Sequence, residues 1–76
     1  MDTRDVLIEI LRELKIDPTG VDAESRLRED LDVDSTEMVE IAVATEKRLA
    51  IVIDTDHFLR IRTFGGIVDY VSGARI

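Results

Sequence analysis

The sequence predicts an all-α fold: a small helical bundle with a long first loop and a short third helix. Three observations support this prediction. Segments near the start, middle and end of the chain place their apolar residues at the spacing that forms one face of a helix. Only residues 51–54 look like a strand, and no other segment offers them a partner. A chain of 76 residues buries only about 60% of its unfolded surface, so we expect one core and a single domain over residues 1–76.

The first predicted helix covers residues 3–16. Its apolar residues recur on one stripe: Val6, Leu7, Ile10, Leu11 and Leu14. Asp2 or Thr3 can cap the free amides at its N-terminus. Asp17 precedes Pro18, and the residue before a proline is driven out of the helical region, so we expect the helix to stop there.

A long connection follows, over residues 17–33. Long loops in compact domains are normally functional or are held in place by their own side chains. Leu27 and Leu31 are the apolar residues that we expect to anchor it. A short turn of helix can form from Glu24 to Leu27.

The second predicted helix begins at Ser35 and runs to about Leu49. Asp34 suits the N-cap, and Glu37 three positions later completes a capping box, in which each side chain accepts from an otherwise unpaired backbone amide. We expect one apolar face, flanked by further apolar residues: Val39, Ala42, Val43 and Leu49, beside Met38, Ile41 and Ala50. The charged residues expected to point outward are Glu37, Glu40 and Lys47.

In the last third of the chain, the residue pattern predicts a buried connection, a short turn and a final helix. Residues 51–54 form the connection, and the turn that follows directs Phe58 and Ile61 inward. Thr63 is placed to cap a helix over residues 64–72. Its apolar side holds Phe64, Ile67, Val68 and Val71.

The charge balance limits the possible partners. Seventeen acidic residues against ten basic ones give a formal net charge of −7. Such a charge repels nucleic-acid phosphates and anionic lipid head groups. We therefore expect no nucleic acid or membrane among the partners, and expect partner proteins that present basic surfaces.

The sequence contains no cysteine, which excludes disulfides, thiolate catalysis and zinc–thiolate sites. The first residues, MDTRDV, lack the basic and apolar regions of a secretory signal. No apolar run approaches the roughly 18 residues needed to span a bilayer. We therefore expect an untargeted cytoplasmic protein.

Three alternating aspartates raise the hypothesis of a calcium loop. Asp30, Asp32 and Asp34 match positions 1, 3 and 5 of an EF-hand loop. However, position 6, which requires glycine for a sharp turn, is Ser35. Position 12, which requires a bidentate glutamate, is the apolar Ile41. The match is therefore only partial.

A second hypothesis concerns the hydroxyl group of Ser35. At the first position of a capped helix it lies beside free backbone amides and the positive end of the helix dipole. A phosphate ester on this serine would be stabilised there, so the position suits a phosphodiester. The alternative is a serine that merely starts a helix, in an acidic adaptor without covalent modification.

The order of motifs resembles one known family. DLDVDSTEMVEI (residues 30–41) is similar to the D-L-G-x-D-S-L motif of acyl carrier proteins. The resemblance continues through EKRLAIVID (46–54) and RIRTFGGIVDYV (60–71), and it covers nearly the whole chain without an evident gap.

The resemblance implies a small four-helix bundle and a covalent cofactor. A phosphopantetheinyl transferase would move 4′-phosphopantetheine from coenzyme A to Ser35, beside the motif residues Asp34 and Thr36, the latter on the partner surface. The terminal thiol of the arm would carry an acyl or aminoacyl group as a thioester. Further partners would be a loading enzyme and an acyltransferase or synthase that accepts the cargo. The protein would be a monomer with no catalytic residue and no metal ligand.

The resemblance also places a partner-binding surface on the second helix. We expect this surface to include Glu37, Met38, Glu40, Ile41, Lys47 and Arg48. Many fatty-acid carriers are acidic where this chain has Lys47, Arg48, Arg60 and Arg62. Mixed charge discriminates against a partner suited to an acidic surface. It favours a discrete carrier of a polyketide, nonribosomal peptide or hybrid pathway over the alternative of fatty-acid synthesis.

Two further residues depart from the family pattern. Asp32 stands in place of a glycine, which is tolerable because aspartate visits left-handed conformations more readily than most residues. Ala50 stands where a glycine commonly ends the second helix, so we expect either a regular end or some backbone strain there.

Overall fold

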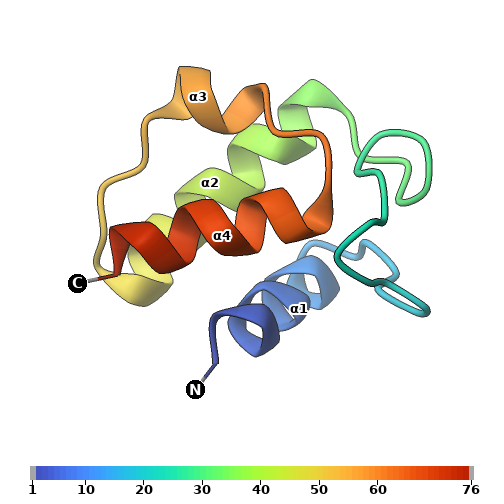
Figure 1. The fold of residues 1–76 in the computed structure, drawn as a ribbon, viewed down its shortest axis with the longest axis horizontal. Coiled ribbons are helices and arrows are strands. Elements are labelled where there is room, and N and C mark those ends of the chain that lie inside the picture. Colours follow the sequence, from blue (N-terminus) through green and yellow to red (C-terminus); the bar gives the residue numbers. More distant parts are fainter. Residues whose placement is uncertain (1, 76) are drawn as a thin grey trace.

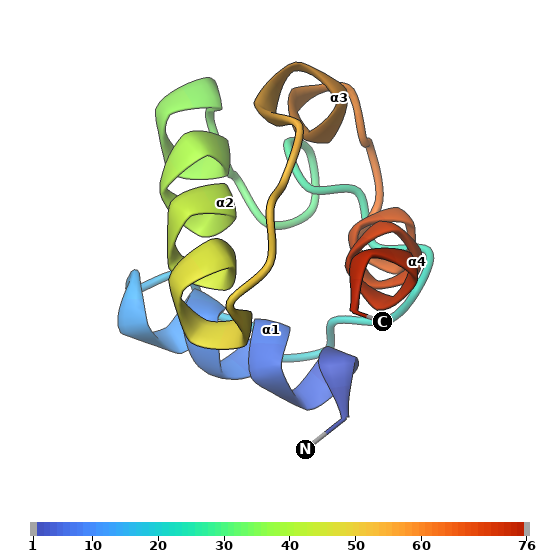
Figure 2. The same ribbon diagram turned by 90° about the vertical axis from the view of Figure 1, so that its left-hand side faces the viewer.

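The computed structural model describes residues 2–75, which form an all-α bundle (Figure 1). The helices are α1 (Thr3–Glu13), α2 (Ser35–Leu49), α3 (Thr55–Leu59) and α4 (Phe64–Ala74). Figure 2 shows α2 and α4 on opposite sides, with α1 at one end of the bundle and α3 at the other. Helix α2 packs against α1 and α3, and α4 packs against α1. This arrangement confirms the predicted bundle with its long first loop and short third helix.

The core lies between the helices and is almost entirely aliphatic, apart from two phenylalanines. It consists of Val6, Leu7, Ile10, Leu11, Ile16, Val21, Leu27, Val33, Met38, Ile41, Ala42, Ile53, Phe58, Phe64, Ile67 and Val71. The complete burial of Phe58 (0% exposed) explains how a helix as short as α3 is held in place. No helix within residues 2–75 is long and apolar enough to cross a membrane.

The predicted start of α1 at Thr3 is confirmed, but its predicted end and its predicted cap require correction. The helix ends at Glu13, not beside Pro18, because Lys15 turns into the left-handed region with a φ of 64°. The Ile16 amide then donates to the Leu11 carbonyl oxygen at 2.8 Å, which is the hydrogen bond of a Schellman motif that spans more residues. This turn buries Ile16. At the other end Asp2 occupies the N-cap position, but its side chain makes no capping hydrogen bond.

The long loop is anchored more by its backbone than expected. Leu27 is buried as predicted, whereas Leu31 is only half-buried and no helical turn forms over residues 24–27. The Gly65 amide donates to the Ala23 carbonyl oxygen at 2.9 Å. A Cβ at Gly65 would lie 2.7 Å from that oxygen, so only glycine permits this approach of the loop to α4.

The bounds predicted for α2 are confirmed, whereas of the predicted apolar face only Ala42 is buried. The side chains that α2 buries are those of Met38, Ile41, Ala42 and Thr45. Val39 and Val43 are instead 38% and 43% exposed. The Thr45 hydroxyl donates to the Ile41 carbonyl oxygen at 2.7 Å, which satisfies it inside the core and allows threonine to occupy a buried position.

The segment after α2 is also less buried than predicted. Of residues 51–54 only Ile53 is buried, and Val52 is 87% exposed. Ala50 takes the left-handed conformation, with a φ of 54°. Of the two expectations for the end of α2, a regular end or backbone strain, the structure therefore shows strain. Further along, Phe58 is buried as predicted, whereas Ile61 remains half-buried.

Helix α4 begins as expected and extends slightly beyond residue 72, to Ala74. The Thr63 hydroxyl accepts from the Gly66 amide at 3.1 Å, which confirms Thr63 as the N-cap. On the predicted apolar side, Val68 is only half-buried. The others are buried: Phe64, Ile67 and Val71.

Candidate functional site

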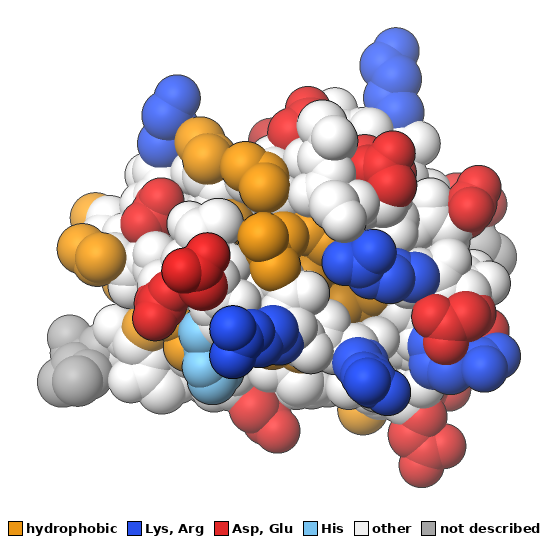
Figure 3. All heavy atoms as spheres, turned by 90° about the horizontal axis from the view of Figure 1, so that it is seen from above, with side chains coloured by type: hydrophobic (Ala, Val, Ile, Leu, Met, Phe, Trp, Pro, Cys, Tyr) orange, Lys and Arg blue, Asp and Glu red, His pale blue; other side chains and the backbone are white. Residues whose placement is uncertain are grey.

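The N-terminus of α2 presents Ser35 on a rigid, capped helix end. The Asp34 carboxylate accepts from the Glu37 amide at 2.8 Å, and the Glu37 carboxylate accepts from the Asp34 amide at 3.1 Å. This reciprocal pair confirms the predicted capping box. Ser35 is the first residue of the helix and is exposed. Figure 3 shows the face that contains this end of α2, together with α3 and the connection to α4.

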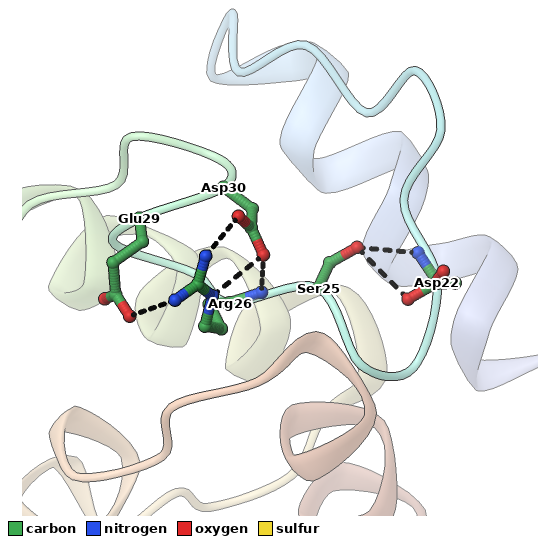
Figure 4. A network of polar contacts seen from close by, with 5 residues as sticks. All are labelled: Asp22, Ser25, Arg26, Glu29 and Asp30. Carbon is green, nitrogen blue, oxygen red and sulfur yellow. Dashed lines mark hydrogen bonds and ion pairs between the residues drawn. The ribbon is translucent and has the colours of Figure 1, made fainter.

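The loop before Ser35 is braced by an arginine (Figure 4). Both carboxylate oxygens of Asp30 accept from Arg26: one from its backbone amide at 2.7 Å, the other from Nη2 at 3.1 Å. These hydrogen bonds lower the pKa of Asp30 below its ordinary value, because they favour the ionised carboxylate. Glu29 lies 3.7 Å from the same guanidinium group.

The geometry does not form the calcium loop considered from the sequence. Asp30 is bound to Arg26, and Asp34 caps α2. Asp32 takes a left-handed conformation, with a φ of 56°. Over the described residues 2–75, no group of three or more histidines, aspartates or glutamates is placed to hold a metal ion.

A cation that the sequence analysis missed contacts the serine. Arg28 Nη1 donates to Ser35 Oγ at 3.3 Å, across a separation of seven residues. A guanidinium group stays protonated and does not act as a general base, so this contact does not activate Ser35 as a nucleophile. The contact suits a hydroxyl that receives a negatively charged group from another enzyme. No sequence motif signals it, because the folding of the loop creates it.

The only histidine, His57, lies on α3 and has a structural environment. Its ring stacks on that of Tyr70, with centroids 4.7 Å apart. Its backbone amide donates to the Asp54 carboxylate at 3.3 Å, which caps α3. The Tyr70 hydroxyl accepts a hydrogen bond from the Asp54 amide at 3.0 Å, so Tyr70 contacts both His57 and Asp54.

Three residues of the predicted partner surface are placed differently by the structure. Met38 and Ile41 are each 1% exposed and belong to the core, so they do not form a docking surface. Arg48 holds α1 against α2 through ion pairs with Glu9 at 2.9 Å and Glu13 at 2.8 Å. Its charge is thereby matched within the molecule.

The exposed part of α2 combines charged and apolar side chains. Glu40 and Lys47 are exposed, as predicted, and their contact with partners stays a prediction. Between them lies a shallow groove of about 350 Å³, to which Val39 and Val43 contribute. Thr36 is also exposed, whereas Glu37 is half-buried within the capping box.

Comparisons with known proteins bear on this serine. Residues 4–71 match the family described as "Phosphopantetheine attachment site". The acyl carrier protein of Acidothermus cellulolyticus is 39% identical over 71 residues, which are 92% of this chain and 84% of that protein. The chain belongs to the acyl carrier protein family. A meromycolate extension acyl carrier protein of Mycolicibacterium smegmatis is 41% identical over 67 residues, 87% of this chain and 68% of that protein.

A solved structure shares the fold as well. The solution structure of the 3,7-dioxo-octyl actinorhodin acyl carrier protein from Streptomyces coelicolor aligns with a TM-score of 0.73 and 31% identity. The alignment covers 96% of this chain and 85% of that one. The resemblance seen in the sequence is thereby confirmed, and so is the family fold.

Membership of the family defines the cofactor and the type of activity. The group of this family is covalently attached 4′-phosphopantetheine, and its members are non-catalytic carriers that interact with phosphopantetheinyl transferases and acyl-handling enzymes. The site fits such a group, since an exposed hydroxyl lies at the positive end of a capped helix and beside the Arg28 guanidinium.

Proposed function

We propose that this acyl carrier protein bears its phosphopantetheine on Ser35 and presents acyl intermediates from there. The observation that carries the proposal is the exposed Ser35 hydroxyl on the first residue of α2, within the segment that resembles the family motif. The capping box holds the helix end, so the attached group would project from the protein at a fixed point and in a fixed direction. We propose residues 1–76 as one carrier domain.

The residues of the chain have defined tasks in this function. Asp34 and Glu37 hold the helix end through the capping box. Ser35 Oγ would form the new bond to phosphorus as the pyrophosphate bond of coenzyme A breaks, with adenosine 3′,5′-bisphosphate as the leaving group and the hydroxyl proton passing to the transferase. When bound, the group supplies a thiol that carries the cargo as a thioester. We propose that Thr36 and Glu40, both exposed near this end of α2, contact partner enzymes.

For the pathway, we propose a polyketide or related natural-product system that uses an acyl or aminoacyl cargo. The similarity to the actinorhodin carrier supports this assignment. Positive charge at Lys47, Arg60 and Arg62, which form no ion pair within residues 2–75, supports it too. Arg48 does not, because Glu9 and Glu13 match its charge. A second candidate is fatty-acid or mycolate extension, favoured by the identity to the meromycolate carriers.

The attachment site is tested by intact mass. Purified apo protein is incubated with coenzyme A and a broad-specificity phosphopantetheinyl transferase. We expect a gain of one phosphopantetheine in the wild type and in a Ser72→Ala control, which removes an exposed serine of α4. Ser35→Ala should gain nothing while keeping its helical circular dichroism spectrum. A mass gain in folded Ser35→Ala would contradict the proposed site.

A further inference from the structure

A groove beside the attachment serine is lined by basic residues. It has a volume of about 390 Å³ and lies between the long loop and the connection from α3 to α4. Its walls are formed by Arg28, Glu29, Leu59, Arg60, Ile61 and Arg62. The Leu27 amide donates to the Arg62 carbonyl oxygen at 2.9 Å, so a backbone hydrogen bond fastens the two walls together. Figure 3 shows basic and apolar side chains side by side on this face.

The three arginines of the groove have no anionic partner in the structure. Within residues 2–75, none of the ion pairs involves Arg28, Arg60 or Arg62. Glu29, the one carboxylate that lines the groove, lies 3.7 Å from Arg26. Guanidinium groups gathered on one groove repel one another unless an anion joins them. The clustering is notable in a chain whose net charge is −7.

We propose that the three arginines form a cationic cradle for the phosphodiester of the attached arm. The inference rests on the attachment at Ser35 proposed above. Arg28 already contacts Ser35 Oγ at 3.3 Å, and this is the atom that would be bonded to phosphorus. The ionised phosphodiester oxygens would therefore lie next to the Arg28 guanidinium, which recognises phosphate through parallel N–H donors.

The opposite wall gives the arm a direction. Arg60 and Arg62 add positive charge to the wall opposite Arg28, and Leu59 and Ile61 add apolar side chains to the same groove. The cradle thus directs the first part of the arm across the groove towards the α3–α4 connection. Arg28 is a positioning residue in this arrangement, because it would orient the arm without touching the thioester.

The first test uses the arginine side chains as reporters. Apo and holo forms of the ¹⁵N-labelled protein are compared, and Arg28→Gln, Arg60→Gln and Arg62→Gln assign the Nε–Hε resonances. We expect the Arg28 resonance to shift most on conversion to the holo form, with smaller shifts for Arg60 and Arg62. Arg12, exposed on α1 and outside the groove, should not shift. Unchanged resonances at all three groove arginines would overturn the cradle.

The second test measures how the arm changes thermal stability. The holo-minus-apo difference in Tm should fall by at least half in Arg28→Gln and remain unchanged in the matched control Arg12→Gln. It should also shrink at 1 M salt, where the screening length is only about 3 Å. An equal difference in the two variants would contradict the proposal. Comparing each variant with its own apo form removes any effect of the substitution on folding itself.

Failure of the cradle can be distinguished from failure of the attachment site. Every holo sample is shown by intact mass to be fully converted before it is compared with its apo form, so a chain that gains no phosphopantetheine refutes the site at Ser35. A converted chain whose arginine resonances move only after loading with malonate, and not with acetate, would assign the groove to a carboxylate of the cargo. A converted chain whose arginines move only on addition of an acidic partner protein would assign the groove to docking. Either result would overturn the cradle.

Discussion

The left-handed end of α2 gives a prediction whose sign depends on the tertiary structure. Ala50 has a φ of 54° and a ψ of 45°, and its side chain is exposed. A left-handed conformation costs a residue with a Cβ roughly 1–2 kcal/mol. We therefore expect Ala50→Gly to stabilise the folded state, because glycine adopts this conformation without that cost and little buried surface is lost.

The magnitude follows from two opposing effects. Relief of the left-handed strain contributes about 1–2 kcal/mol, and the greater freedom of glycine in the unfolded chain takes back about 0.4–1 kcal/mol. From the middle of each range, the net increase in the free energy of unfolding should be about 0.8 kcal/mol, which raises the Tm by roughly 3–6 °C in a domain of this size. Urea and thermal denaturation followed by circular dichroism measure both quantities.

The matched control is the same substitution inside the helix. Ala44 lies within α2 and is half-buried. Ala44→Gly should destabilise the protein by about 1 kcal/mol, because glycine is the poorer helix former. Opposite signs for the two variants would support the left-handed end of α2. If Ala50→Gly destabilises as Ala44→Gly does, the strain argument is refuted.

Two further predictions concern charge. Glu40→Lys should slow modification by a basic-faced transferase several-fold at low salt, and Lys47→Glu should accelerate it, with both effects lost at high salt. Initial rates of modification are measured by mass spectrometry. Rates insensitive to charge would contradict an acidic docking surface. The pKa of Asp30 should lie below 3.8 in a carboxyl ¹³C titration, owing first to its hydrogen bonds with Arg26, and should return towards 3.8 in Arg26→Gln. The stabilising effect of this ionised carboxylate is fully present above pH 3.8 and is lost as the pH falls through the lowered pKa; an unchanged titration in the variant would refute the brace.

Local chemistry made several elements predictable from the sequence. The start of α2 depends on Asp34 and Glu37, whose capping contacts join residues only three positions apart. Thr63 determines the start of α4 in the same way, through a hydrogen bond to Gly66. These contacts depend mainly on near neighbours, so a pattern in the sequence could predict them, although the side chain of Asp2 at the N-cap of α1 makes no such bond.

The buried face of α2 was not predictable in this way. The helix carries two neighbouring apolar stripes, and either can face a core by periodicity alone. Packing against α1 and α3 buries the stripe with Met38 and Thr45 and leaves Val39 and Val43 exposed. The neighbouring helices α1 and α3 determine which stripe is buried, because they fix how α2 is rotated about its axis.

The amino-acid sequence by itself determined the helical class, the bounds of α2, the acidic character and the serine at the helix start, since each follows from composition or from contacts between near neighbours. Only the tertiary structure decided which charges are matched and which remain open. Arg48 forms ion pairs with Glu9 and Glu13, from which the long loop separates it in the sequence. Arg28 contacts Ser35 and lines a groove with Arg60. Contacts between residues distant in the chain depend on how the loop and helices fold together, and no local pattern records them.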